Sequence, residues 1–205
     1  MLNKLRDSLQ PTMTRLGTSF ASTGLSPNFW TGIALALSIG AGIAYALPAL
    51  ALITWYHASV IGGVLLLISG FFDVVDGNVA RVTKQTSKKG AFFDSSFDKI
   101  SEVIIFGGIA FGNLANPFWC LVALGMSLLV SYTRARAESL GVELKGIGIG
   151  ERAERLLILA IIGMIPIGPY QNQAGMNWAV IIVSIVAGIT LVQRIVATSK
   201  ELSST

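Results

Sequence analysis

Long stretches without a charged residue alternate with short charged segments along this chain. The three longest charge-free runs cover residues 16–72, 103–133 and 156–193. A helix needs about 20 residues to cross the hydrocarbon core of a membrane. The first and third runs are each long enough for two crossings, and the middle run holds two if they extend into the charged sequence on either side.

Turn-forming residues interrupt each charge-free run near its middle. They are Pro48, the segment Asn113–Pro117 and the segment Gly168–Gly175, and Pro, Asn and Gly are the residues that end helices and turn the chain. The pattern therefore predicts three hairpins of helices. The six predicted spans cover about residues 28–47, 53–79, 91–113, 117–139, 152–170 and 177–198.

The N-terminal residues follow a different pattern. Apolar residues recur at positions 2, 5, 9, 13 and 16, which is the spacing of one face of an α-helix. Residues 2–16 are therefore predicted to form a short amphipathic helix on the inner membrane interface. The expected fold is all-α: a single polytopic membrane domain over residues 1–205, with six transmembrane helices and this N-terminal amphipathic interfacial helix.

Composition and charge support this interpretation and give it an orientation. Of the residues, 53% are hydrophobic and 13% are charged, against about 25% charged in a typical soluble domain. All 15 Lys and Arg residues lie near the termini or in the two charged connections and their flanking helix ends. The positive-inside rule then places both termini and these connections on the cytoplasmic side of the cell membrane, with Pro48, Asn116 and Gln171 outside. Because the basic residues border membrane helices, they argue against a nucleic-acid partner.

Four aspartates stand where the second and third predicted spans meet. Asp73 and Asp76 are three residues apart, and Asp94 and Asp98 are four apart, so each pair lies on one helical face. Two carboxylates about 4 Å apart repel by about 4 kcal/mol at an effective dielectric constant of 20. Four together need cations, and hard oxygen ligands suit Mg²⁺ or Mn²⁺, with room for two ions. Membrane carboxylates also serve ion or proton pathways, so a cation transporter is an alternative.

Two further residues favour a phosphate-binding site over an ion pathway. Gly77 follows Asp76 directly and leaves space for a ligand to approach the backbone, although it also suits helix packing. Arg81 lies one turn further and can bind a phosphate through two parallel hydrogen bonds, although it also suits a membrane anchor. The outer halves of the predicted spans carry almost no polar residues, which argues against a transport pathway.

The spacing of these residues resembles a known signature. Asp73-x2-Asp76-Gly77-x2-Ala80-Arg81-x8-Gly90-x3-Asp94-x3-Asp98 is similar, at every fixed position, to the signature of the CDP-alcohol phosphotransferase family. The resemblance covers essentially the whole chain, because that family also has six spans. It implies that a CDP-activated lipid gives its phosphatidyl-type group to an alcohol and that CMP leaves.

The resemblance also implies roles for individual residues. It assigns Asp73, Asp76, Asp94 and Asp98 to the metals, and gives Asp98 a second, catalytic role as general base toward the acceptor hydroxyl. The residues that it assigns to the CDP-lipid are Pro27, Asn28, Thr31, Asp73, Gly77, Ala80 and Arg81. A carboxylate that takes the proton is needed because an alcohol is otherwise a poor nucleophile.

Basic residues around the predicted loop between the fourth and fifth spans indicate the class of acceptor. Arg134 and Arg136 end the fourth span, and Arg152 and Arg155 begin the fifth. Cations oppose the dipole at a helix N-terminus, so a bound anion explains the position of Arg152 and Arg155. We therefore expect a phosphorylated acceptor. The residues expected to bind its phosphate are Ser131, Arg134, Arg136, Arg152, Arg155 and Arg194.

The identity of the acceptor rests on resemblance. The stretch from Tyr132 to Glu138 and the later Glu-Arg-x-Glu-Arg segment resemble the branch of the family that uses inositol 1-phosphate. The alternative is the same chemistry with glycerol 3-phosphate. The family resemblance further implies a homodimer. The spacing Gly108-x3-Gly112 indicates close helix packing, either within or between chains.

Overall fold

The computed structural model describes residues 2–144, 146–166 and 174–203, with side chains for residues 11–144, 146–166 and 175–203. These residues form helices and no strand, which confirms the all-α prediction for the described part of the chain. The helices are α1 (Leu2–Ala21), α2 (Pro27–Ala46), the short 3-10 helix η1 (Leu47–Leu50), α3 (Trp55–Val82), α4 (Lys88–Phe111), α5 (Pro117–Ser139), α6 (Arg152–Gly163) and α7 (Ala174–Ser203).

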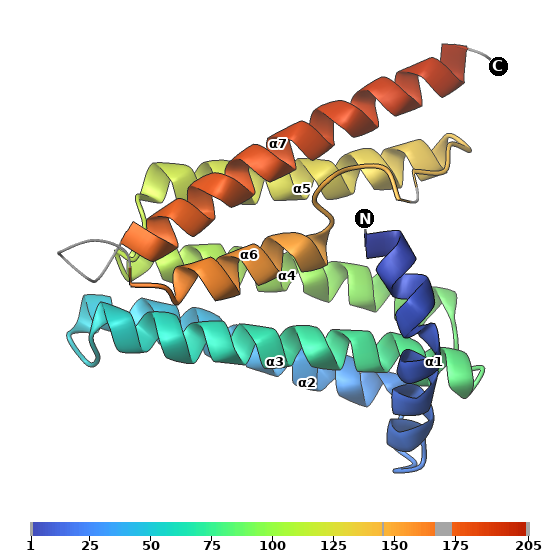
Figure 1. The fold of residues 1–205 in the computed structure, drawn as a ribbon, viewed down its shortest axis with the longest axis horizontal. Helices are drawn as coiled ribbons and strands as arrows, with labels where there is room; N and C mark the ends of the chain where they lie inside the picture. Colours follow the sequence, from blue (N-terminus) through green and yellow to red (C-terminus); the bar gives the residue numbers. More distant parts are fainter. Residues whose placement is uncertain (1, 145, 167–173, 204–205) are drawn as a thin grey trace.

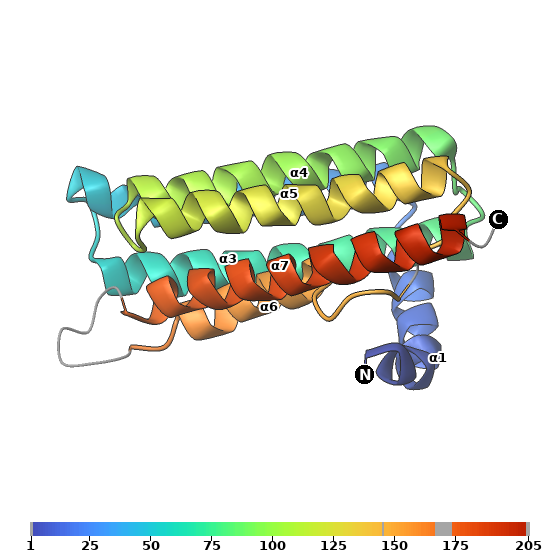
Figure 2. The same ribbon diagram turned by 90° about the horizontal axis from the view of Figure 1, so that it is seen from above.

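Helices α2 to α7 run roughly along one axis, and α1 crosses them at one end (Figures 1 and 2). Helix α2 packs against α3 and α4, α5 packs against α4 and α7, and α6 packs against α3 and α7. The end of α3, the start of α4 and the ends of α5 and α7 lie at the same end of the bundle as α1 (Figure 1). The segments that carry the predicted aspartates are therefore brought to one end, and α6 begins nearer the middle of the bundle (Figure 1).

Local sequence explains why most helices begin where they do. Pro27 and Pro117 stand in the first turns of α2 and α5, where a missing N–H costs no helical hydrogen bond. The side chains of Thr54, Ser87 and Asn116 accept hydrogen bonds from backbone N–H groups at the starts of α3, α4 and α5. The predicted spans agree with α2 to α5 within three residues at each end.

Helix α6 is shorter than the predicted fifth span. It ends at Gly163, whereas the span was predicted to extend over residues 152–170. Pro166 gives the reason, because a proline cannot donate the next helical hydrogen bond and disfavours helical conformation in the residue before it. Residues 167–173, which include the predicted end of this span and most of the predicted turn, lie outside the described residues.

Four of the helical segments are long and apolar enough to cross a membrane: Pro27–Leu50, Trp55–Val82, Pro117–Ser139 and Gly175–Ser203. Large apolar side chains point outward along them, as Leu121 and Val192 do at 69% and 60% exposure. Such a surface suits contact with lipid. Helix α4 is charged in its first half and α6 has 12 residues, so the six-span count and the interfacial position of α1 stay predictions.

Close backbone contacts join α2 to α4. A Cβ atom at Gly108 would overlap the carbonyl oxygen of Gly42, and one at Gly112 would overlap the carbonyl oxygen of Tyr45. The predicted small-residue face of Gly108 and Gly112 therefore packs within the chain. This contact fixes α4, and with it the aspartates near its start, against α2.

Candidate active site

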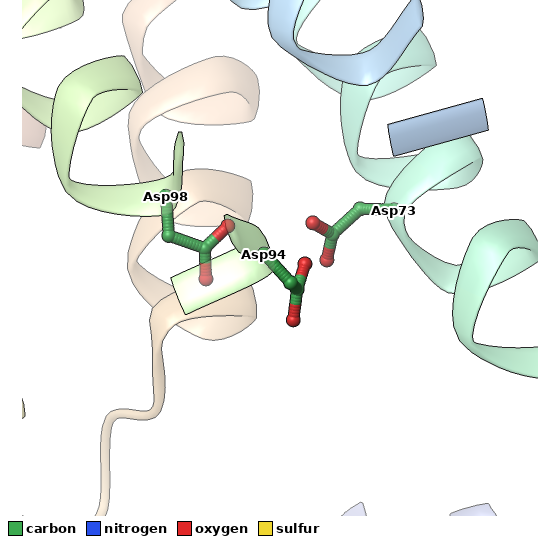
Figure 3. Close-up of side chains that lie close together, drawn as sticks. All are labelled: Asp73, Asp94 and Asp98. Carbon is green, nitrogen blue, oxygen red and sulfur yellow. The ribbon is translucent and has the colours of Figure 1, made fainter. Parts of the chain in front are cut away.

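Three carboxylates converge from two helices. Asp73 is on α3, and Asp94 and Asp98 are one turn apart on α4 (Figure 3). One oxygen of each carboxylate lies within 4.8 Å of the others. Helices α3 and α4 both pack against α2, and the short connection between them brings the end of α3 near the start of α4. The structure thus gathers three of the four predicted aspartates.

Asp76 stands apart from this group, one turn further along α3. Its side chain is buried at 6% exposure, and its Oδ2 has no hydrogen-bond partner among the described residues. A buried carboxylate oxygen without a partner is unfavourable by about 1–3 kcal/mol or more. Such an atom indicates a bound ligand or cation that supplies the missing partner.

Arg152 places a positive charge inside the carboxylate group. Its NH1 atom lies 3.1 Å from Oδ1 of Asp73 and 2.8 Å from Oδ1 of Asp98. The sequence prediction assigned Arg152 to an acceptor phosphate and did not anticipate these ion pairs. They partly offset the repulsion between aspartates that face each other from α3 and α4.

The donor atoms fit a hard divalent cation. Carboxylate oxygens are the ligands that Mg²⁺ and Mn²⁺ prefer, and Asp73, Asp94 and Asp98 supply them from a rigid two-helix scaffold. Asp76 adds a buried carboxylate oxygen without a partner beside them. One guanidinium against four carboxylates leaves negative charge in excess, which favours binding of further positive charge.

A cavity of about 250 Å³, here called cavity A, lies between α2, the end of α3 and the start of α4. It collects the residues that the sequence assigned to the CDP-lipid, with one exception: Asp73 lines the neighbouring cavity instead. Cavity A is lined by Pro27, Asn28, Thr31, Asp76, Gly77, Ala80, Arg81, Gln85, Thr86, Ser87, Gly90, Ala91 and Asp94.

Two residues shape the interior of cavity A. A Cβ atom added to Gly77 would have no atom within 4 Å, so this glycine borders open space. The NH2 group of Arg81 donates a hydrogen bond of 2.8 Å to Oδ1 of Asn78, which holds the guanidinium at the cavity wall. Cavity A therefore combines a cation with an accessible helix surface.

A second cavity of about 470 Å³, here called cavity B, lies on the other side of the carboxylates. Ala91 and Asp94 line both cavities. Of the six residues predicted for the acceptor phosphate, the structure brings five to cavity B. These are Ser131, Arg134, Arg152, Arg155 and Arg194.

Arg136 is the predicted acceptor residue that does not line cavity B. Residues two apart on a helix point in nearly opposite directions, so Arg134 and Arg136 cannot share one face of α5. The side chain of Arg136 lies near Ser139 on the same helix, at 3.5 Å. Arg134 lines the cavity and pairs with Glu138 at 2.8 Å.

Two of the cavity B arginines also hold backbone carbonyl groups. Arg194 donates from Nε to the carbonyl of Ile147 and from NH1 to the carbonyl of Val130, at 3.0 and 2.9 Å. Arg155 donates from NH1 to the carbonyl of Gly150 at 2.9 Å. These bonds fasten the segment between α5 and α6 to α6 and α7, join α7 to α5, and so shape one wall of the cavity.

Charged residues that the sequence prediction did not select also reach cavity B, namely Lys99, Glu138 and Glu151. Behind the wall lies Glu102, buried at 1% exposure and paired with Arg155 at 3.2 Å. A signal was present, because Glu102 follows Asp98 by four residues and so shares its helical face.

The chain is similar in sequence to a known protein family and to several of its members. The model of the CDP-alcohol phosphatidyltransferase family matches residues 25–197. The chain is 33% identical over 205 residues to the archaetidylinositol phosphate synthase of Pyrococcus horikoshii, with 98% of each protein covered. It is 37% identical over 150 residues to the phosphatidylinositol phosphate synthase of Streptomyces avermitilis, covering 68% of this chain and 62% of that protein.

Solved structures show the same fold. The phosphatidylinositol phosphate synthase of Mycobacterium tuberculosis with CDP-DAG bound aligns with a TM-score of 0.73 at 24% identity, covering 91% of this chain and 92% of the other. The same enzyme in complex with manganese and citrate aligns with a TM-score of 0.74 at 23% identity, covering 91% and 88%.

Proposed function

The chain belongs to the CDP-alcohol phosphatidyltransferase family, and from this premise we propose that it transfers the phosphatidyl-type group of a CDP-activated lipid to inositol 1-phosphate and releases CMP. The observation that carries the proposal is the arrangement of two cavities on either side of one carboxylate group. Cavity A has the residues that suit a nucleotide diphosphate, and cavity B has the cations that suit a phosphorylated acceptor.

We assign the donor to cavity A. Arg81 supplies a guanidinium for the diphosphate, and its bond to Asn78 limits the loss of side-chain freedom on binding. Gly77 leaves the surface of α3 open to the ligand. Pro27, Asn28 and Thr31 close the cavity from the start of α2.

We assign the acceptor to cavity B. Arg134, Arg152, Arg155 and Arg194 reach it from three helices, and their guanidinium groups suit a phosphate dianion. The names of the relatives support inositol phosphate as the acceptor, because the relatives that match this chain include archaetidylinositol and phosphatidylinositol phosphate synthases.

The reaction is a displacement at the phosphorus atom that bears the lipid. A hydroxyl oxygen of the acceptor forms the new P–O bond, and the bond between that phosphorus and the bridging oxygen of CMP breaks, so CMP leaves with the electron pair. The hydroxyl proton passes to Asp98. Because Oδ1 of Asp98 is paired with Arg152, we assign the proton to Oδ2.

Asp73, Asp76, Asp94 and Asp98 would hold Mg²⁺ or Mn²⁺, as two ions in each subunit. When bound, these cations supply charge stabilisation to the non-bridging and leaving oxygens of the diphosphate. A relative of the same fold has been solved in complex with manganese, which supports this assignment. Arg152, between Asp73 and Asp98, keeps these carboxylates in place.

We also propose how the protein lies in the membrane. Six crossings, with α4 and α6 completing the four apolar spans, put the carboxylates and both cavities on the cytoplasmic side, where soluble inositol phosphate arrives. Helix α1 then lies along the inner interface of the cell membrane. A homodimer remains a prediction from the family.

An acceptor comparison tests the proposed function. Purified protein receives labelled CDP-lipid and Mg²⁺ with inositol 1-phosphate, glycerol 3-phosphate or serine, each in a separate reaction. We expect CMP release and a new lipid only with inositol 1-phosphate. Turnover with glycerol 3-phosphate alone would overturn the acceptor assignment, and turnover with serine alone would overturn the role of cavity B as a phosphate site.

A further inference from the structure

A buried carboxylate lies behind cavity B. Glu102 is on α4, one turn after Asp98, and its side chain is 2% exposed. It lines neither cavity. Its Oε1 atom nevertheless lies 3.2 Å from NH2 of Arg155, 3.7 Å from Nζ of Lys99 and 3.9 Å from Nε of Arg152.

The three cations around Glu102 all line cavity B. Lys99 belongs to α4, whereas Arg152 and Arg155 begin α6. One carboxylate oxygen therefore ties the first turn of α6 to α4 and holds three positive charges near one point. Without this negative charge the cations would repel one another across a poorly solvated site.

A purely stabilising role does not account for this arrangement. Burying an ion pair costs desolvation that the attraction often fails to recover. The Oε2 atom of Glu102 is also buried and has no partner among the described residues, which adds a further cost. A carboxylate kept under these conditions, directly behind cations that face a cavity, fits a role in arranging those cations.

We propose that Glu102 is a positioning residue for the acceptor: it fixes Lys99, Arg152 and Arg155 in the arrangement that binds the acceptor phosphate. This inference rests on the proposed function, since it takes cavity B as the acceptor site. Glu102 itself does not touch the acceptor. The same arrangement assigns Lys99, which was not among the residues predicted for the acceptor, to the binding of the acceptor phosphate.

The test is the Glu102→Gln variant, which keeps the side-chain volume and removes the charge. Two quantities are measured: the KM for inositol 1-phosphate in the CMP-release assay, and its Kd by calorimetry without donor. Replacing a residue that orients a ligand from behind commonly weakens binding 10–100-fold at metal sites. We expect a rise of about tenfold or more in both quantities, with the KM for CDP-lipid nearly unchanged.

Glu143→Gln provides a matched control, because Glu143 is an exposed glutamate on the segment between α5 and α6 and loses the same charge. It should leave both acceptor constants unchanged. Glu102→Asp keeps the charge but withdraws it by one methylene group, so its acceptor KM should lie between those of the wild type and Glu102→Gln. This second variant decides the matter if Glu102→Gln does not fold.

A double-mutant cycle with Arg155→Lys separates positioning from general stability. If Glu102 acts through Arg155, the two changes should raise the acceptor KM by less together than the product of their separate effects. Independent effects on KM would overturn the inference, as would acceptor binding in Glu102→Gln that is unchanged or tighter. Tighter binding would mean that Glu102 competes with the phosphate for the cations.

Failure of this inference can be told apart from failure of the proposed function. If the wild type turns over with glycerol 3-phosphate instead, the acceptor assignment fails, and the same KM comparison with that acceptor still tests Glu102. If the wild type turns over with inositol 1-phosphate and Glu102→Gln shows unchanged acceptor constants, the role of Glu102 alone fails.

Discussion

Gly77→Ala should raise the stability of the protein while weakening its affinity for the CDP-lipid. Gly77 is within α3, and a Cβ atom there would meet no atom within 4 Å. Glycine in a helix interior is about 0.5–1 kcal/mol less favourable than alanine. The variant should therefore be more stable by that amount, which corresponds to a Tm increase of about 1–4 °C for a chain of this size.

The same methyl group projects into cavity A, whose volume is about 250 Å³. An extra methyl group in a filled site costs about 1–3 kcal/mol, which corresponds to about 5- to 150-fold in affinity. Donor affinity should fall within this range, measured as the Kd of CDP-lipid by calorimetry and as its KM in the CMP-release assay.

Gly70→Ala provides the control, since Gly70 is also on α3, a Cβ atom there would meet nothing within 4 Å, and it lines neither cavity. It should give the same gain in Tm with unchanged donor constants. Equal donor constants in the two variants would refute the placement of the donor in cavity A. A lower Tm for Gly77→Ala would refute the open space beside α3.

Three further predictions address the base, the acceptor arginines and the topology. Asp98→Asn should stop CMP release, because no carboxylate then takes the hydroxyl proton. It should keep more CDP-lipid binding than the Asp→Asn variants at positions 73, 76 and 94. Near-normal turnover of Asp98→Asn would contradict the role of Asp98 as base. Arg134→Ala should raise the acceptor KM by about 12- to 160-fold, because a hydrogen bond to a charged group contributes about 1.5–3 kcal/mol. Arg136→Ala should change this KM little, because Arg136 does not line cavity B. Equal effects of the two variants would contradict the placement of the acceptor in cavity B. A cysteine at Lys88 should be shielded from an impermeant reagent in intact cells, and one at Pro48 should react; the opposite pattern would invert the topology.

Sequence alone predicted the helices well where local chemistry determines them. Pro27 and Pro117 begin helices, and Thr54, Ser87 and Asn116 cap them. Such signals act within a few residues and can be read from the sequence. The length of α6 depended on Pro166, which carries no charge and so does not interrupt the charge-free run of residues 156–193.

Six of the seven residues that the family resemblance assigned to the CDP-lipid line cavity A, whereas Gln85, Thr86 and Ser87 of the connection before α4 were not predicted. Cavity B is lined by five of the six residues predicted for the acceptor phosphate. Arg136 lies on another face of α5 from Arg134, which the two-residue spacing already indicated. The ion pairs of Arg152 with Asp73 and Asp98 join helices that are distant in sequence, so no local pattern could reveal them.

Glu102 was missed for a related reason. In sequence it lies in the middle of the predicted third span, and its one local signal is that it follows Asp98 by four residues. Its significance comes from the first turn of α6, which brings Arg152 and Arg155 to the same carboxylate. Long charged side chains can reach several neighbours, and only the folded chain, which brings the start of α6 within side-chain reach of α4, decides which.

We propose that the carboxylates of α3 and α4 hold the metal ions and the base for transfer of a lipid phosphate from a donor in cavity A to an inositol phosphate in cavity B. Purified protein with CDP-lipid, Mg²⁺ and inositol 1-phosphate provides the decisive measurement, with CMP quantified by chromatography and the lipid product identified by mass spectrometry. We expect one lipid carrying the intact inositol phosphate for each CMP released, and neither product from Asp98→Asn. CMP release without that lipid would refute the transfer, because the diphosphate would then be cleaved without passing to the acceptor.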